Sequence, residues 1–163
     1  MKNYAFILAF LLVASVSFAQ KSPRKQSDGK IGDVTVNIDY GAPSVKGRKV
    51  WGGLEKYGKV WRAGANENTT ISFDKDVTIN GKPLAAGKYG FFIIPKEKEA
   101  WTIIFNKKNS NWGAFKYKQK EDAFRLDITP NFVDENQEQL LYAISANSID
   151  IAWEKMRISI PIN

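Results

Sequence analysis

The chain has 163 residues, of which 44% are hydrophobic and 25% are charged, and its formal net charge is +7. It contains no histidine and no cysteine. Their absence excludes disulfide bonds, a thiol nucleophile, imidazole acid–base catalysis and metal sites built from these two residue types. The length suits one domain with its own hydrophobic core, and the excess of Lys and Arg attracts anions to the surface.

The first nineteen residues have the layout of a secretory signal peptide. Lys2 supplies a short basic start, an apolar run covers residues 4–16, and Ser17 and Ala19 place small side chains before a cleavage site. We therefore expect residues 1–19 to be removed after Ala19 and the mature chain to be exported to the periplasm or beyond. No later apolar run approaches the roughly 20 residues of a membrane-spanning helix, and export makes nucleic acid an unexpected partner.

Residues 20–30 are polar and basic and include Pro23. Because this segment offers almost no apolar side chains to bury, we expect a flexible basic leader over residues 20–30. The folded domain is then expected to cover residues 31–163.

Alternation of apolar and polar side chains predicts strands through most of this domain. In the first of them, Val34, Val36 and Ile38 share one face. The predicted strands are residues 34–40, 69–73, 77–79, 89–94, 101–105, 124–128, 140–146, 149–153 and 156–160. Eight or nine short strands separated by turns predict an all-β fold, namely a single antiparallel β-sandwich of the immunoglobulin-like or jelly-roll-like type.

Several local patterns add detail to this fold. Asn80-Gly81 predicts a tight turn, and Tyr89 resembles a tyrosine corner, in which the hydroxyl binds the backbone a few residues upstream. The apolar face changes parity at Glu154-Lys155, which indicates a tight hairpin or a bulge, and we favour the hairpin. Residues 134–141 are the only segment expected to form a helical turn or two.

Three loop segments carry the most distinctive motifs. Residues 40–48 contain Tyr-Gly-Ala-Pro and Lys-Gly-Arg, residues 60–67 read Val-Trp-Arg-Ala-Gly-Ala-Asn-Glu, and residues 106–113 contain Asn-Lys and Trp-Gly. In this order the motifs resemble the exported bacterial proteins grouped as domain of unknown function 2911, over nearly all of the mature chain. The resemblance implies a β-sandwich and assigns no activity and no site residues. Ala63 departs from the family pattern, which often carries Thr there.

The same loops supply the candidate ligand-binding residues. Exposed indole rings would offer flat surfaces on which sugar rings stack, whereas buried rings would only plug the ends of the sandwich. Arg62 and Glu67 flank a turn and are expected to pair, either in a cleft or as a structural tie. The candidate site residues are Lys46, Arg48, Trp51, Trp61, Arg62, Asn66, Glu67 and Trp112.

These residues favour a non-catalytic binding module for a carbohydrate-like or anionic ligand of the cell envelope, with no metal and no cofactor. One alternative is a domain that binds an envelope protein through an apolar patch, for which residues 91–94 are the support. A second alternative is a hydrolase without histidine, which would use two carboxyl groups. No spacing selects a pair among Asp39, Glu55, Glu67 and Asp122.

Overall fold

The computed structural model describes residues 21–163, and the predicted signal peptide lies outside these residues. The described chain is almost entirely β-structure, with one short 3-10 helix, η1 (Gln119–Glu121). The strands are β1 (Arg24–Ile31), β2 (Val34–Gly41), β3 (Thr69–Phe73), β4 (Val77–Ile79), β5 (Lys82–Leu84), β6 (Gly87–Ile94), β7 (Trp101–Asn106), β8 (Asp122–Ile128), β9 (Asn131–Ile144) and β10 (Ser148–Pro161). The predicted all-β fold is confirmed.

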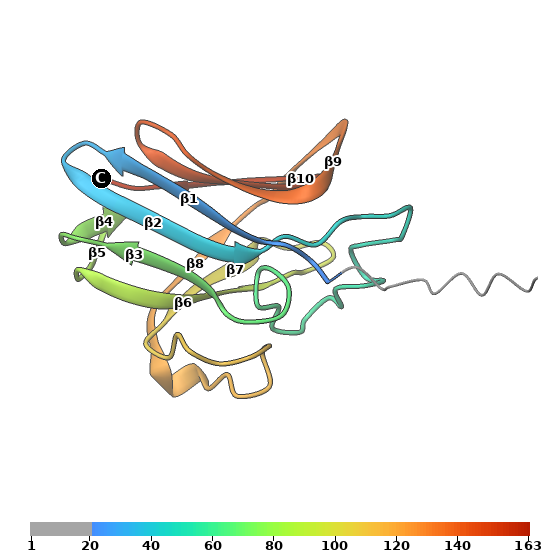
Figure 1. Cartoon of the computed structure of the whole chain (residues 1–163), viewed down its shortest axis with the longest axis horizontal. Coiled ribbons are helices and arrows are strands. Elements are labelled where there is room, and N and C mark those ends of the chain that lie inside the picture. Colours follow the sequence, from blue (N-terminus) through green and yellow to red (C-terminus); the bar gives the residue numbers. More distant parts are fainter. Residues whose placement is uncertain (1–20) are drawn as a thin grey trace, which may run out of the picture.

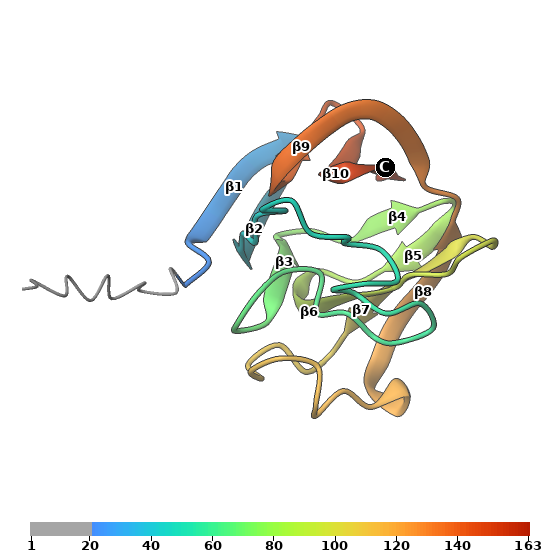
Figure 2. The ribbon, with the colours of Figure 1, turned by 90° about the vertical axis from the view of Figure 1, so that its right-hand side faces the viewer.

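Six strands form the main antiparallel sheet, in the order β1-β2-β3-β6-β7-β8. The layer of β9 and β10 lies over one face of this sheet (Figure 1), and β9 arches from the end of β8 towards β1 (Figure 2). The two layers enclose the core, as the predicted sandwich requires. The main sheet follows chain order except for the inserted β4–β5 hairpin, so its connections are those of a meander rather than of a Greek key.

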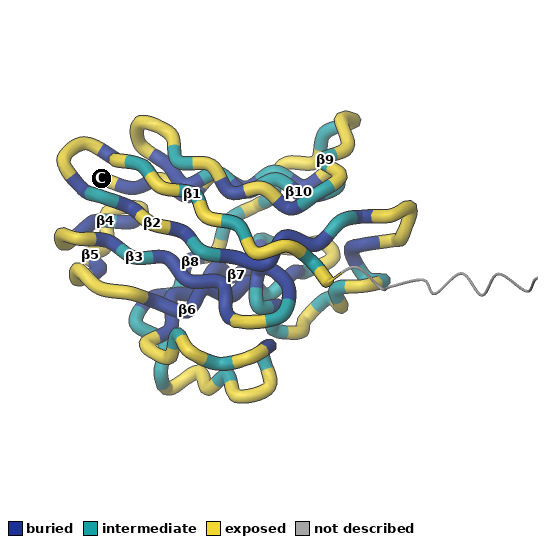
Figure 3. The backbone as a smooth tube through the Cα atoms, viewed as in Figure 1, coloured by how far each residue is buried: buried dark blue, intermediate teal, exposed yellow. Residues whose placement is uncertain are grey.

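The expectation of a flexible leader over residues 20–30 is wrong for most of that segment. Residues 24–31 form β1, which pairs with β2 along its whole length. The physical reason is that backbone hydrogen bonds hold an edge strand without large apolar side chains. Polar contacts add to this pairing, because Ser27 Oγ donates a hydrogen bond to Tyr142 O over 2.7 Å. Figure 3 accordingly shows β1 as a largely exposed or half-buried strand at the edge of the sheet.

The strand β9 replaces the helical turn expected at residues 134–141, so that expectation is wrong. Residues 131–144 pair at several points with β10, and this cross-strand pairing overrides the local propensity. Pairing at Gln137 follows pairing at Phe132, with a register shift between them. The shift accompanies the curvature of β9 seen in Figure 2.

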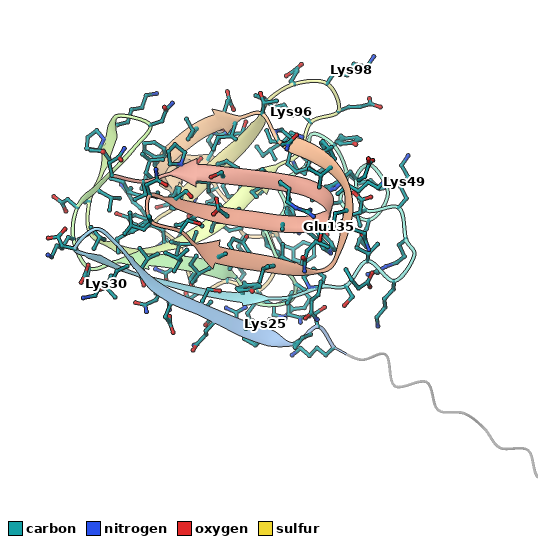
Figure 4. The ribbon with its side chains drawn as sticks, turned by 90° about the horizontal axis from the view of Figure 1, so that it is seen from above. Lys25, Lys30, Lys49, Lys96, Lys98 and Glu135 are labelled. Carbon is teal, nitrogen blue, oxygen red and sulfur yellow. The ribbon has the colours of Figure 1, made fainter. Side chains whose placement is uncertain are left out.

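The strand β10 reverses its direction at Glu154-Lys155, as the favoured hairpin predicts. Ser159 Oγ donates to Asp150 Oδ1 over 2.6 Å, and Ile162 N donates to Asn147 O over 2.9 Å. An uninterrupted strand would hold residues 150 and 159 roughly 30 Å apart. Glu154 has φ +53°, which places the reversal in the left-handed region. Viewed from above, the two arms lie beside β9 (Figure 4).

The core between the layers is built around four tryptophan rings. Trp51 lies at the centre, with its ring centroid 4.6 Å from that of Trp101, 5.5 Å from that of Trp61 and 5.6 Å from that of Trp153. Two of these rings come from the long loop between β2 and β3, which is therefore anchored in the core. The predicted tyrosine corner is present too, because Tyr89 Oη donates to Ala85 O over 2.7 Å.

Candidate functional site

Two of the three motif-bearing loops lie side by side. Asn68 N donates a hydrogen bond to Asn111 O, and Gly113 N donates to Asn66 O, each over 2.9 Å. These bonds join the loop that leads into β3 to the loop that follows β7. The two loops are adjacent because β3 and β7 flank β6 in the main sheet. Two of the three loops that supply the candidate residues therefore meet at one end of the main sheet.

A cleft of about 300 Å³ lies between the joined loops and the β1 edge of the sheet. We call it the Asn68 cleft. It combines amide, hydroxyl and charged side chains with one indole ring. Its lining residues are Arg24, Asp39, Glu67, Asn68, Thr70, Lys88, Asn109, Ser110, Asn111 and Trp112. Glu67 and Trp112 are the two predicted site residues among them.

Asn68 is the unusual member of this cleft. Only 2% of the residue is exposed, and neither its side-chain oxygen nor its side-chain nitrogen has a hydrogen-bond partner in the described structure. A buried amide without partners loses its hydration without compensation, at a cost of about 1–3 kcal/mol. Its backbone is satisfied, since Asn68 O accepts a bond from Arg24 Nη2 over 2.7 Å. The side chain thus leaves one donor group and one acceptor unpaired in the wall of the cleft, just below its accessible surface.

Trp112 provides the aromatic surface of the cleft. Its residue is 56% exposed, and its ring lies nearly parallel to that of Phe115, with an interplanar angle of 7° and a centroid separation of 6.3 Å. The Arg62 guanidinium lies over the indole, 5.7 Å from its centroid, which is a cation–π geometry. Trp112 is therefore the tryptophan that meets the expectation of an exposed ring.

Both carboxylates of the Asn68 cleft already have a cationic partner. Arg24 Nε donates to Asp39 Oδ1 over 2.6 Å, and Lys21 Nζ lies 3.6 Å from Glu67 Oε1. The Glu67 backbone N–H lowers the pKa of that carboxyl and the Lys21 charge adds to the effect, so the pKa lies below its usual value. The expected charge pair between Arg62 and Glu67 is not among the ion pairs of the described residues, because Lys21 takes the place of Arg62.

Trp51 and Trp61 do not reach the cleft. Of the two alternatives for these rings, burial is the one that holds, and their place among the ligand-binding candidates is wrong. They are only 6% and 3% exposed and belong to the core. Large indole rings gain more from burial between the layers than from exposure at a rim. Trp61 Nε1 donates to Gly64 O over 3.2 Å, which shapes the turn before Asn68. Asn66 has a structural role as well, since its side chain donates to Ser22 O over 3.4 Å.

Lys46 and Arg48 lie at a second concavity, of about 340 Å³, which we call the basic pocket. Arg48 Nη2 donates to Ser44 O over 2.6 Å and Arg48 Nε donates to Val45 O over 3.0 Å. Lys21 also lines this pocket. The prediction that Lys46 and Arg48 belong to the same region as Glu67 is therefore met only at the border between the two concavities.

A further cavity, of about 510 Å³, lies on the outer face of the β9–β10 layer, and no sequence pattern indicates it. Its floor consists of cross-strand neighbours, for example Ala143 opposite Asp150 and Leu141 opposite Ala152. Burial raises the pKa of Asp150, but hydrogen bonds from three serine hydroxyls outweigh it, and the pKa lies below its ordinary value. The Asp150 carboxylate of this cavity thus already has partners, unlike the Asn68 side chain.

One carboxyl in the described structure has a strongly raised pKa, and it does not line the Asn68 cleft. Burial raises the pKa of Glu55 to about 7, against the lowering effect of the Arg62 and Arg48 charges. The described residues contain no group of three or more Asp and Glu side chains placed to hold a metal ion.

Sequence reasoning had not selected Arg24, Asp39, Asn109 or Asn111 for the site. The available signal was the density of asparagine in the second and third loops, where Asn66, Asn68, Asn109 and Asn111 lie close to the motifs. Arg24 gave no signal, because its role depends on β1, which the sequence pattern did not predict.

Comparison with known proteins places the chain in a family. No curated protein and no solved structure matches it. Among residues 21–163 there is no helix long and apolar enough to cross a membrane. A family model described as "Protein of unknown function (DUF2911)" matches residues 22–162, which include β1 and all three motif-bearing loops. The chain therefore belongs to this family, as its loop motifs indicated.

Proposed function

We propose that the chain is an exported, non-catalytic module that binds a carbohydrate in the Asn68 cleft. The observation that carries the proposal is the Asn68 side chain, which is buried and unpaired next to an exposed indole. A fold that leaves an amide desolvated without a partner gives up stability. Such a cost is explained when a ligand supplies the missing hydrogen bonds.

Carbohydrate fits this cleft better than a purely apolar ligand does. A sugar ring has an apolar face that stacks on an aromatic ring, and its hydroxyl groups both donate and accept hydrogen bonds. Trp112 would receive the ring face. The amides of Asn68, Asn109 and Asn111 supply the mixed donors and acceptors. Lys88 adds a donor for further hydroxyl or carbonyl oxygens.

A hydrolase without histidine is less well supported. Asp39 and Glu67 both line the cleft, and two carboxyl groups are what glycoside hydrolysis needs. One of the two must act as a general acid with a raised pKa, whereas the pKa of Glu67 is lowered. Glu55 has the raised pKa but lies elsewhere. Binding therefore accounts for these groups more simply than catalysis does.

The alternative of an envelope protein-interaction domain now depends on a different surface. Phe91, Phe92 and Ile93 are buried, so the predicted patch at residues 91–94 is part of the interior. The outer face of the β9–β10 layer is the remaining apolar surface in its favour, with Leu141 exposed. We rank this function second, because nothing in the structure identifies what would cover that face.

The test begins with a glycan array probed with the mature chain and continues by calorimetric titration of the glycans that bind. Trp112→Ala should weaken binding by about twofold to tenfold, since losing one stacking surface costs roughly 0.5–1.5 kcal/mol. Leu141→Ala, an exposed truncation on the β9–β10 face, is the matched control and should bind normally. The proposal fails if no glycan binds or if both variants bind like the wild type.

Asn68→Leu separates binding from folding. Leucine has a similar volume and needs no hydrogen bonds, so the free energy of unfolding should stay the same or rise by about 1 kcal/mol. Glycan binding should be lost. A variant that is clearly less stable than the wild type in urea would show that the amide has partners within the fold, and it would remove the main support for the proposal.

A further inference from the structure

We infer that the carbohydrate is acidic and that one of its anionic groups occupies the basic pocket. This inference rests on the proposed function and adds the class of ligand. The basic pocket is lined by Lys21, Lys46 and Arg48, and no acidic side chain is among its lining residues. In the Asn68 cleft, by contrast, each carboxylate has a cationic partner. Lys21 is paired with Glu67, whereas Lys46 and Arg48 form none of the ion pairs of the described residues, so the basic pocket holds two cationic groups without a direct ion pair.

The Arg48 guanidinium is fixed in place before any ligand arrives. Its bonds to Ser44 O and Val45 O use Nη2 and Nε and bind the side chain back onto its own loop. The Nη1 group and the second proton of Nη2 take no part in these two bonds. A fixed guanidinium with free N–H groups binds a carboxylate, sulfate or phosphate without a large loss of side-chain entropy.

The loop that carries Lys46 is fixed as well. Lys46 has φ +49°, and its backbone N–H donates to Glu138 Oε1 over 2.9 Å. Val45 N donates to Glu138 O over 2.8 Å. The loop is thus anchored to β9 at two successive residues. Two acids lie near this loop. Glu138 bonds the backbone amide of Lys46 and leaves the lysine ammonium free to face an anion, and Glu55 is close enough for the Arg48 charge to act on its pKa.

The basic pocket adjoins the Asn68 cleft through the segment at residues 21–24. Lys21 lines the basic pocket, while its ammonium lies 3.6 Å from the Glu67 carboxylate of the cleft. Ser22 and Pro23 line the basic pocket, and the next residue, Arg24, lines the cleft. A single oligosaccharide can therefore stack on Trp112 and place a negative group near Arg48. An anion there would also compete with Glu67 for Lys21.

The experiment uses an array on which carboxylated, sulfated and phosphorylated glycans each stand beside their neutral parent. We expect the acidic member of a pair to bind at least tenfold more tightly, a difference of about 1.4 kcal/mol. The Lys46→Ala/Arg48→Ala double variant should abolish this preference and leave the affinity for the neutral parent unchanged. The bound acid also shows which of the three anionic groups the pocket prefers.

The matched control is Lys59→Ala/Lys98→Ala, which removes the same charge from two exposed lysines in other loops. It should retain the preference for acidic glycans. The inference is overturned if only neutral glycans bind, which leaves the proposed function intact, or if the control variant loses as much affinity as the pocket variant. Equal binding of a single-stranded oligonucleotide would also overturn it, because the attraction would then be a general response to negative charge.

Trp112→Ala distinguishes the failure of the inference from the failure of the proposed function. If acidic glycans bind and this substitution does not weaken them, the basic pocket acts alone and the carbohydrate proposal for the Asn68 cleft fails. If Trp112→Ala weakens acidic and neutral glycans equally while the Lys46/Arg48 double variant changes neither, the cleft proposal stands and the acidic inference fails.

Discussion

Glu55 illustrates how strongly the surroundings of one side chain can change its pKa. Burial raises the pKa of its carboxyl to about 7, even though the positive charges of Arg62 and Arg48 act in the opposite direction. This raised pKa could not be predicted from the sequence, because Glu55 lies in a polar, glycine-rich loop whose burial depends on Trp51 entering the core. The positions of the tryptophans are equally hard to predict. A tryptophan in the sequence indicates an aromatic contact, but it does not indicate whether that contact is with a ligand or with the core.

Because the pKa of Glu55 is raised in the folded state, ionisation of its carboxyl should destabilise the fold as the pH rises. The folded state holds the Glu55 proton more tightly than the unfolded state, whose pKa is near 4.5. The stabilisation is complete below pH 4.5 and is lost as the pH rises through 7. Glu55→Gln should therefore gain stability over the wild type across this window, by up to about 3 kcal/mol. Urea unfolding from pH 4 to 8 measures the difference, and parallel stability profiles would contradict it.

At the scale of elements, residue periodicity predicted the strands that have an apolar face and failed for those that do not. The central strands β3 and β7 begin where their apolar patterns begin. Periodicity did not predict β1, because this strand is held by backbone hydrogen bonds and has few apolar side chains. It did not predict the first half of β9, because the side chains there are largely exposed. The reversal inside β10 was predictable, because a hairpin changes which side chains face the core.

The reversal in β10 can be tested by two neighbouring substitutions. Glu154 has a left-handed φ of +53°, and a residue other than glycine pays about 1 kcal/mol or more for it. Glu154→Gly should raise the free energy of unfolding by roughly 0.5 kcal/mol or more, after the extra entropy of glycine in the unfolded chain. Lys155 has no positive φ, so Lys155→Gly should lower stability. Thermal unfolding of both variants measures the two changes in stability. If Glu154→Gly were less stable than the wild type and Lys155→Gly more stable, a strained reversal at Glu154 would be excluded.

At the scale of the whole molecule, the candidate site arises from parts that are distant in the sequence. The Asn68 cleft combines β1, the loop before β3 and the loop after β7, and the basic pocket adds the loop after β2. The sequence predicted the all-β sandwich and the family to which the three loop motifs belong. It also indicated an exposed ring among Trp51, Trp61 and Trp112, without selecting Trp112. It could not predict which loops meet, since that depends on strand order, nor the cavity on the β9–β10 face, which depends on cross-strand register.

The most direct test of the central claim is to map the site by nuclear magnetic resonance. The mature chain, labelled with ¹⁵N, would be titrated with a glycan that binds on the array. We predict that the side-chain amide signal of Asn68 and the indole N–H signal of Trp112 shift with the same dissociation constant, while backbone amides of Leu141 and Ser159 stay unchanged. Shifts confined to the β9–β10 face, with Asn68 and Trp112 unaffected, would contradict the account.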